Sequence, residues 1–480
     1  MVIPNEASSP HRYFLSDEPS SADPLDYDAF VHHTIFSSVH GNLVSQYKKS
    51  HIVGVIAQDW KTSSDFKVWE FSVRPNIVFE DGSAIDAKAI VRSMTRMAFL
   101  LRQRHSQDGT LSRLKGWNQL KNASQTFEGI HSKENKVLFK FVRPVEDFLE
   151  AVSFGQYGIV HPNMYEETSG EWKVKKRTIS SSFYRLKDWT NDSLTIALRQ
   201  DFLPKVRHQN PLEEVEFFWH RNQETPIHSD LLGGMENAED LRQTHVYGGG
   251  TKSKILYARC DSWRNKTSVF HDIDSRRCLR SLFYQGLKAE GIEVTSSFFP
   301  KSIRGVTEPE KNPAQKINGH IDQKKIIATQ APESNPKTLS KDFGKSYNHA
   351  LSMMANYAEL DLEIVPPIQR DERQSGARTV DIEPRGTGLK IESPHRDIRF
   401  MFKSKEGIQL PDLDGQIEQE LENESFDVQR VNELLWDQAI IWPIAHLGAG
   451  VWYKKDKYEF SQLNTSLPPI EFQWIGLKKE

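Results

Sequence analysis

Residues 41–97 constrain the fold of this 480-residue chain more than any other stretch. Within them, residues 68–73 (V-W-E-F-S-V) alternate with the period of a half-buried β-strand. The pair Asp81-Gly82 predicts a tight turn. Asp86 then stands where an N-cap would begin a helix over residues 87–97, with apolar residues along one stripe. The stretch therefore predicts a strand, a turn and a capped helix in close succession.

Composition and charge narrow the class of protein. A chain of this length can bury two or three domain cores. The 62 basic and 65 acidic side chains nearly balance, and no basic block with interleaved aromatic residues recurs, which argues against nucleic acid as a partner. The most apolar stretch, residues 434–452, is interrupted by Asp437 and Pro443, so we expect a buried helix end followed by a strand.

The N-terminus and the cysteines bear on the cellular compartment. Residues 1–6 hold no basic stretch followed by an apolar one. The protein is therefore either cytoplasmic or made with an export signal that the printed sequence does not include. Two cysteines, Cys260 and Cys278, are present, and we expect Cys278 at a buried helix position in preference to a disulfide between them.

Motifs of catalysis and metal binding are missing from the sequence. It contains no Gly-x-Ser-x-Gly, no phosphate-binding Gly-x-x-x-x-Gly-Lys-Ser/Thr and no His-Glu-x-x-His. The adjacent His32 and His33 would point to opposite faces of a strand and so could not readily bind one metal. We therefore predict a binding protein without cofactor or metal, and not an enzyme.

Four stretches carry a resemblance to one known family. Residues 41–97 contain Leu-Val, Ala-x-x-Trp, an aromatic strand ending in Arg, Phe-x-Asp-Gly and a helix, in that order. Residues 173–189, 270–279 and 426–444 add a Tyr-x-Leu corner, a capped helix, and a last helix followed by a strand. In these features the chain resembles the family 5 extracellular solute-binding proteins, the oligopeptide and dipeptide receptors of bacterial ABC importers. Residues 180–182 are serines where that family has a glycine-rich corner, so we expect another backbone path there.

The resemblance implies an α/β protein with the two-lobed periplasmic-binding-protein fold (type II, cluster C) and an extra subdomain inserted in the first lobe. The implied segments are residues 1–37 of the first lobe, the inserted subdomain over 38–151, residues 152–252 of the first lobe, the second lobe over 253–439, and residues 440–480 returning to the first lobe. We expect crossings near Gly248 and Ile440, with residues 440–444 in the first-lobe sheet. Three consecutive glycines, Gly248 to Gly250, have the composition of a hinge or loop.

The resemblance also implies a ligand site between the lobes, in which strands pair with an extended peptide. The implied site residues are Gly388, Leu389, Lys390, Ile391 and Glu392 on one wall, and a strand of Asp26, Tyr27, Asp28, Ala29 and Phe30 on the other. Glu392 stands where the family places an Asp that holds the peptide ammonium, although a solvent-facing carboxylate is the alternative. Tyr27 and Phe30 could instead be core residues. Four arginines, Arg370, Arg373, Arg378 and Arg385, include possible partners for a ligand carboxylate, although most of them are expected to be solvated.

The implied function is that of a monomeric receptor, outside the cytoplasmic membrane, which presents a peptide or other small solute to an ABC permease. A periplasmic or cell-surface location follows, with an export signal absent from the printed sequence. Two alternatives stay open: a non-peptide solute such as a metal chelate, haem or sugar, and a ligand sensor for a signalling partner.

Overall fold

A computed structural model places most of the chain. The residues that it describes are 10–15, 18–26, 30–47, 51–104, 110–202, 204, 207–219, 229–235, 242–301, 303, 305–309, 325–331, 343–366, 380–388, 420, 427–454, 456–460 and 472–478.

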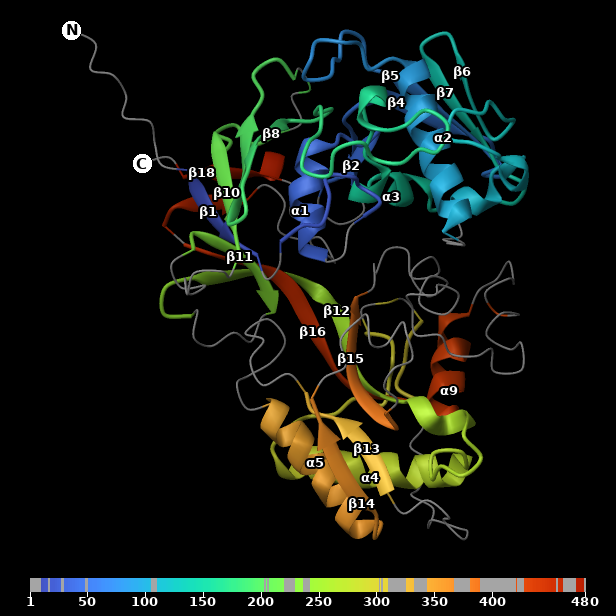
Figure 1. Ribbon diagram of the computed structural model, residues 1–480, viewed down its shortest axis with the longest axis vertical. Coiled ribbons are helices and arrows are strands. Elements are labelled where there is room, and N and C mark those ends of the chain that lie inside the picture. Colours follow the sequence, from blue (N-terminus) through green and yellow to red (C-terminus); the bar gives the residue numbers. More distant parts are fainter. Residues whose placement is uncertain are drawn as a thin grey trace, which may run out of the picture.

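Ten of the described strands form one mixed sheet that runs through both halves of the molecule (Figure 1). In spatial order they are β14 (Asp361–Val365), β13 (Lys325–Thr329), β15 (Ile382–Gly388), β12 (Val246–Cys260), β16 (Ile441–Tyr453), β11 (Leu231–Met235), β1 (His11–Phe14), β10 (Glu214–Phe218), β9 (Ser193–Leu198) and β8 (Tyr184–Trp189). The described helices are α1 (Phe30–Val39), α2 (Ala87–Gln103), α3 (Phe148–Val152), α4 (Ile273–Ala289), α5 (Phe343–Tyr357) and α9 (Val428–Gln438).

A smaller sheet is built into the first half of the chain, beside α2. Its four strands, in spatial order, are β4 (Ala57–Thr62), β5 (Val68–Val73), β7 (Lys136–Lys140) and β6 (Ile130–Lys133). Two further pairs of strands, β2 (Val44–Gln46) with β3 (Ile52–Gly54) and β17 (Tyr458–Phe460) with β18 (Ile475–Leu477), complete the described sheets.

Separate hydrophobic cores define two lobes. The first core joins buried residues between positions 13 and 231 with residues from 451 onward. The second lobe has two cores on opposite faces of its part of the large sheet, one against α4 and α5 and one against α9. Figure 1 shows β12 and β16 running from one lobe into the other. The two-lobed α/β fold is thereby confirmed, while the predicted boundaries of the lobes and of the inserted subdomain stay a prediction.

The two strands that join the lobes are long and irregularly paired. β12 and β16 are antiparallel, and their register shifts near Gly249, Lys252 and Leu256. Such shifts are β-bulges, where a strand bends and twists more strongly. The glycines predicted to form a hinge or loop therefore lie inside a strand, because β16 supplies backbone partners that a sequence pattern does not reveal.

The position of residues 440–444 also differs from the expectation. Ile441 pairs with Arg259, and Trp442 and Ile444 belong to the second-lobe core beside α4 and α5. β16 enters the first lobe only further along, where Val451 joins the first core. A strand of 13 residues is long enough to span both lobes, so its alternation of side chains does not tell where one lobe ends.

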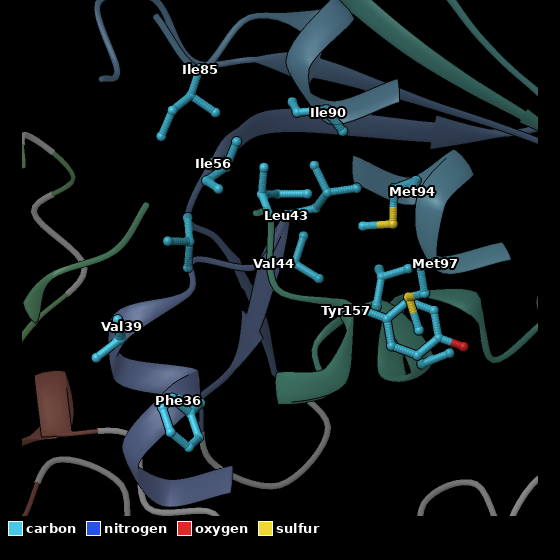
Figure 2. Packing of buried hydrophobic residues seen from close by; sticks show 14 of the residues in the cluster. Phe36, Val39, Leu43, Val44, Ile56, Ile85, Ile90, Met94, Met97 and Tyr157 are labelled. Carbon is cyan, nitrogen blue, oxygen red and sulfur yellow. The ribbon is translucent and has the colours of Figure 1, made fainter. Parts of the chain in front are cut away.

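Residues 41–97 supply many of the buried side chains of the first core (Figure 2). β5 alternates between half-buried and buried side chains as predicted. Asp86 caps α2 by accepting a hydrogen bond from the Ala89 backbone N–H, and Gly82 has a φ of 82°, which the turn requires. Ile90 and Met94 then project from α2 into the core drawn in Figure 2.

Three serines, Ser180 to Ser182, stand at the corner where the family has glycines, and none of them has a positive φ angle. The Ser180 hydroxyl donates to the Val39 carbonyl oxygen over 2.8 Å. The Ser181 hydroxyl accepts from the Gly41 backbone N–H over 2.9 Å. A Cβ at Gly41 would lie 2.3 Å from the Ser181 carbonyl oxygen, which only a glycine avoids. Serine hydroxyls thus satisfy backbone groups that this corner buries.

No disulfide joins the two cysteines, which are both buried, and Cys278 lies on α4 as predicted. Burial raises the pKa of the Cys260 thiol well above its usual value. A neutral, enclosed thiol of this kind is chemically inert.

Buried histidine makes stability depend on pH. His40 is fully enclosed and its Nε2 bonds to the Ala22 carbonyl oxygen over 2.9 Å. Burial lowers the pKa of His40 from 6.5 to about 4, while that hydrogen bond and the Asp23 carboxylate oppose the change. Because the unfolded chain takes up this proton at higher pH than the folded one, stability present above pH 6.5 is lost as the pH falls to about 4. This difference in pKa between the unfolded and the folded chain corresponds to about 3 kcal/mol of unfolding free energy.

We expect His40→Gln to keep an N–H donor near Ala22 while it removes this titration. Urea unfolding at pH 7 and pH 4.5 should show a smaller loss of stability for the variant than for the wild-type protein. Equal losses in the two proteins would mean that His40 does not stay neutral in the folded state.

Candidate functional site

The first-lobe wall of the predicted site is held by a buried ion pair. Asp23 accepts two hydrogen bonds from the Arg96 guanidinium, over 3.1 and 2.5 Å, and both side chains are almost wholly enclosed. Arg96 also donates to the Gly170 carbonyl oxygen over 2.7 Å and lies over the rings of Tyr165 and Trp172. Through these contacts, α2 holds the segment that leads to the predicted wall.

The predicted wall itself is only partly described. Asp26 makes a half-exposed pair with Arg104, at the end of α2, over 2.8 Å. Tyr27, Asp28 and Ala29 lie outside the described residues. Phe30 begins α1, so this end of the predicted strand is wrong. The helix follows from the apolar residues that recur along α1, of which Ile35, Phe36 and Val39 belong to the first core.

The predicted second-lobe wall begins at the end of β15, a strand that pairs with β12. β15 pairs with β12 along its whole length, and its last residue, Gly388, lies opposite Lys254. Lys254 in turn is at one of the register shifts between β12 and β16. Gly388 is therefore placed at the junction of the lobes. Leu389, Lys390, Ile391 and Glu392 lie outside the described residues.

A cluster of charged side chains covers one face of β12 and β15. Arg259 lies opposite Glu383, and Tyr257 lies opposite Arg385, in the register of the two strands. Arg259 also bonds to Asp261, and Arg385 donates to Glu383 over 2.5 Å. Glu383 is only 3% exposed, whereas both arginines keep about a sixth of their side-chain surface open. With all four groups ionised the cluster has no net charge, and it is partly shielded from solvent.

Burial dominates the electrostatics of this cluster. It raises the pKa of Asp261 above the usual range of an aspartate; Arg259 opposes the rise and Glu383 adds to it. Burial likewise raises the pKa of Tyr257 to about 12, against the effect of the two arginines. The cluster therefore offers a carboxyl group able to carry a proton next to two fixed positive charges.

Sequence reasoning missed this cluster. Arg385 was expected to be solvated, but it pairs with Glu383. The only signal available was the alternation of Ile382, Glu383, Pro384 and Arg385 along a strand, which puts both charges on one face. Nothing in the sequence pairs that strand with residues 257–261. The other three arginines, Arg370, Arg373 and Arg378, lie outside the described residues.

One group of side chains has the composition of a hydrolase triad but not its geometry. The Ser83 hydroxyl lies 2.6 Å from Asp81 and 3.1 Å from His161 Nε2. His161 Nδ1 accepts a hydrogen bond from the Asn163 backbone N–H over 3.1 Å, so in the neutral ring Nε2 carries the proton. Nε2 then donates toward Ser83 and Asp81 and cannot accept the serine proton. The group therefore lacks the base that would activate Ser83 as a nucleophile.

The structure also contradicts the expectation that the two adjacent histidines lie in a strand. His32 and His33 lie in α1, a helix, and not in a strand. His32 is buried in the first lobe. Within the described part of the chain, no three His, Cys, Asp or Glu side chains gather as metal ligands. The described helices also include none with the length and hydropathy of a membrane span.

Two lobes joined by a pair of long strands define the class of bilobal solute-binding proteins. The sequence model of the bacterial extracellular solute-binding proteins, family 5 (middle region), matches residues 51–223. The periplasmic murein peptide-binding protein MppA of Escherichia coli (strain K12) is 32% identical over 83 residues, which are 17% of this chain and 15% of that protein. Residues 51–223 thus match the family that the sequence resembles, and this chain spans only a small part of the length of the curated relative.

Solved structures show the same fold over the whole chain. The structure of the E. coli murein tripeptide-binding protein MppA has a TM-score of 0.75 at 16% identity, with 98% of both chains covered. Haemophilus influenzae OppA in complex with the peptide RPPGFSPFR has a TM-score of 0.76 at 13% identity, with 98% of this chain and 99% of that chain covered. At such low identity these likenesses bear on the fold alone.

Proposed function

We propose that this chain is the receptor of an ABC importer, which encloses a peptide or peptide-like ligand between its lobes and presents it to a membrane permease. The main support is the connection of two separate cores through β12 and β16, whose pairing shifts where the chain passes between the lobes. One relative is named as a murein peptide-binding protein, and one similar structure is a complex with a nonapeptide. Both favour a peptide as the ligand class.

Hinge closure is the proposed mechanism. A ligand that contacts both lobes binds the closed form more tightly than the open one and so shifts the population toward it. Bulges near Gly249 and Lys252 supply the positions where both strands can change their bend. The permease then recognises the closed form.

The proposed surroundings follow from this role. The receptor acts as a monomer in the periplasm or at the cell surface, and it carries out no chemical step. The charged cluster of Arg259, Asp261, Glu383 and Arg385 faces the end groups or side chains of the ligand, and Glu392 holds its ammonium group. Both assignments rest on the placement of β15 at the junction of the lobes.

Native mass spectrometry of protein purified without refolding tests the ligand class. We expect a distribution of added masses from co-purified peptides, and a smaller radius of gyration in small-angle scattering when the released mixture is added back to emptied protein. One discrete non-peptide mass would support a different solute. A radius that stays constant at saturation would argue against closure.

A further inference from the structure

The second lobe ends in a strand with an open edge. β14 is the outermost described strand of the large sheet and pairs only with β13 in the described part of the chain (Figure 1). The Val365 carbonyl oxygen accepts a hydrogen bond from the Gln330 backbone N–H over 2.8 Å, so Val365 faces β13. Because the backbone groups of alternate residues point to the same edge of a strand, those of Leu362 and Ile364 point outward. No described strand pairs with them.

The two edges of the ten-stranded sheet differ in how well they resist a further strand. β8, at the opposite edge, has a shift in register beside Leu186. Its exposed side chains are charged: Arg185, Lys187 and Asp188. Bulges and charges of this kind protect an edge from pairing. β14 instead keeps a continuous register with β13 over all five of its residues, so it is the edge that can accept another strand.

A groove lies between β14 and α5. It has a volume of about 300 Å³ and is lined by residues 360–362 and Ile364, and by Ser352, Ala355 and Asn356 of α5. Tyr357, near the groove at the end of α5, is 68% exposed, and Ile364 is 36% exposed. They are two of the four large apolar side chains that are exposed in the described part of the chain. The groove therefore offers space and apolar surface to a side chain from outside.

The other face of β14 is acidic. Asp361 and Glu363 are exposed and lie at alternate positions of the strand, on the face opposite to Ile364. Lys325 of β13 pairs with Glu363 over 2.8 Å, whereas Asp361 has no ion pair among the described residues. An added strand is therefore favoured if it places a cationic side chain on this face.

This charge pattern disfavours a second copy of the chain as the added strand. Two β14 strands that pair in antiparallel fashion about Glu363 would place the two Glu363 side chains directly opposite each other. Like charges at such positions are destabilising. A segment of different sequence, with lysine or arginine at these positions, avoids the conflict.

We propose that the edge of β14 is a docking surface for an extended segment of a partner protein, in which apolar residues alternate with lysine or arginine. The segment adds to the sheet as a further strand, and its backbone bonds to the outward groups of Leu362 and Ile364. An apolar side chain enters the groove beside α5, and cationic side chains face Asp361 and Glu363. This docking is separate from the proposed transport ligand, because the site between the lobes uses none of these residues.

Hydrogen exchange of the whole protein, followed by mass spectrometry, tests the proposal. The probe is the capped peptide acetyl-Lys-Val-Lys-Val-Lys-amide, and the control probe has glutamate in place of each lysine. We expect the basic probe to slow exchange in the segment that contains residues 361–365, because the outward N–H groups of Leu362 and Ile364 become hydrogen-bonded. The acidic probe should leave exchange in that segment unchanged.

A matched pair of variants shows whether the strand edge itself binds the probe. Ile364→Pro removes one outward N–H at a position where an edge strand tolerates proline, whereas Ile364→Thr keeps this donor and a β-branched side chain. Ile364→Pro should weaken binding of the basic probe about tenfold or more, and Ile364→Thr much less. Asp361→Lys leaves the backbone unchanged and should weaken the same binding by about fivefold, which keeps the test open if the proline variant does not fold.

The outcome is distinguishable from that of the transport proposal. None of the three variants should alter the added masses in native mass spectrometry. Unchanged exchange over residues 361–365 with the basic probe, or equal protection by the acidic one, would overturn the docking surface. A concentration-dependent dimer in analytical ultracentrifugation that Ile364→Pro abolishes would overturn it too, because the occupant would then be a second copy of this chain.

Discussion

Replacing Asp23 by asparagine is expected to destabilise the protein by about 3–5 kcal/mol. The change keeps the shape of the side chain but removes its charge, so Arg96 stays buried opposite a neutral group. The other contacts of Arg96, with a carbonyl oxygen and two aromatic rings, do not neutralise its charge. The loss should be measured as a lower urea midpoint with an unchanged slope.

Asp26→Asn is the matched control, three residues further along the same segment. Its partner Arg104 is also an arginine on α2, but the pair is open to solvent, so we expect a loss of at most about 1 kcal/mol. Losses of similar size in the two variants would contradict the view that enclosure of the Asp23 pair makes the difference.

The second large effect concerns ligand affinity and depends on the proposed role of Glu392. We expect Glu392→Gln to weaken binding of a free-amine peptide by about 2–5 kcal/mol, because one side of a desolvated ion pair loses its charge. Isothermal titration calorimetry with wild-type and variant protein measures the difference, which corresponds to roughly 30-fold to several thousand-fold in affinity.

The N-acetylated form of the same peptide is the control for this variant. It has no ammonium group, so both proteins should bind it with equal affinity. Affinities for the free amine within about twofold of each other would remove Glu392 as the anchor. The peptide assignment would then rest on the likeness of fold alone.

Local features of this chain were predictable because their causes are local. The alternation in β5, the cap at Asp86 and the turn at Gly82 each depend on a few neighbouring residues, and all three are present. The helix that begins after Asp86 extends to Gln103, further than the predicted end at residue 97, because apolar residues continue along its buried face.

Features that depend on pairing between distant segments were not predictable in this way. The triple glycine was interpreted as a hinge or loop, but it lies within β12 since β16, some 200 residues later, runs beside it. The charged cluster has the same origin. Arg259 and Glu383 become neighbours only through the register of β12 and β15, and no pattern within either segment specifies that register.

The sequence by itself showed a resemblance to one family, the kinds of secondary structure around residues 41–97, and the residues of a site that this resemblance implies. Tertiary structure alone decided that Asp23 meets Arg96 and that four charges gather where β12 and β15 pair. The physical reason is range. Backbone preferences and capping act over a few residues, whereas burial and electrostatic pairing act between groups that only the folded chain brings together.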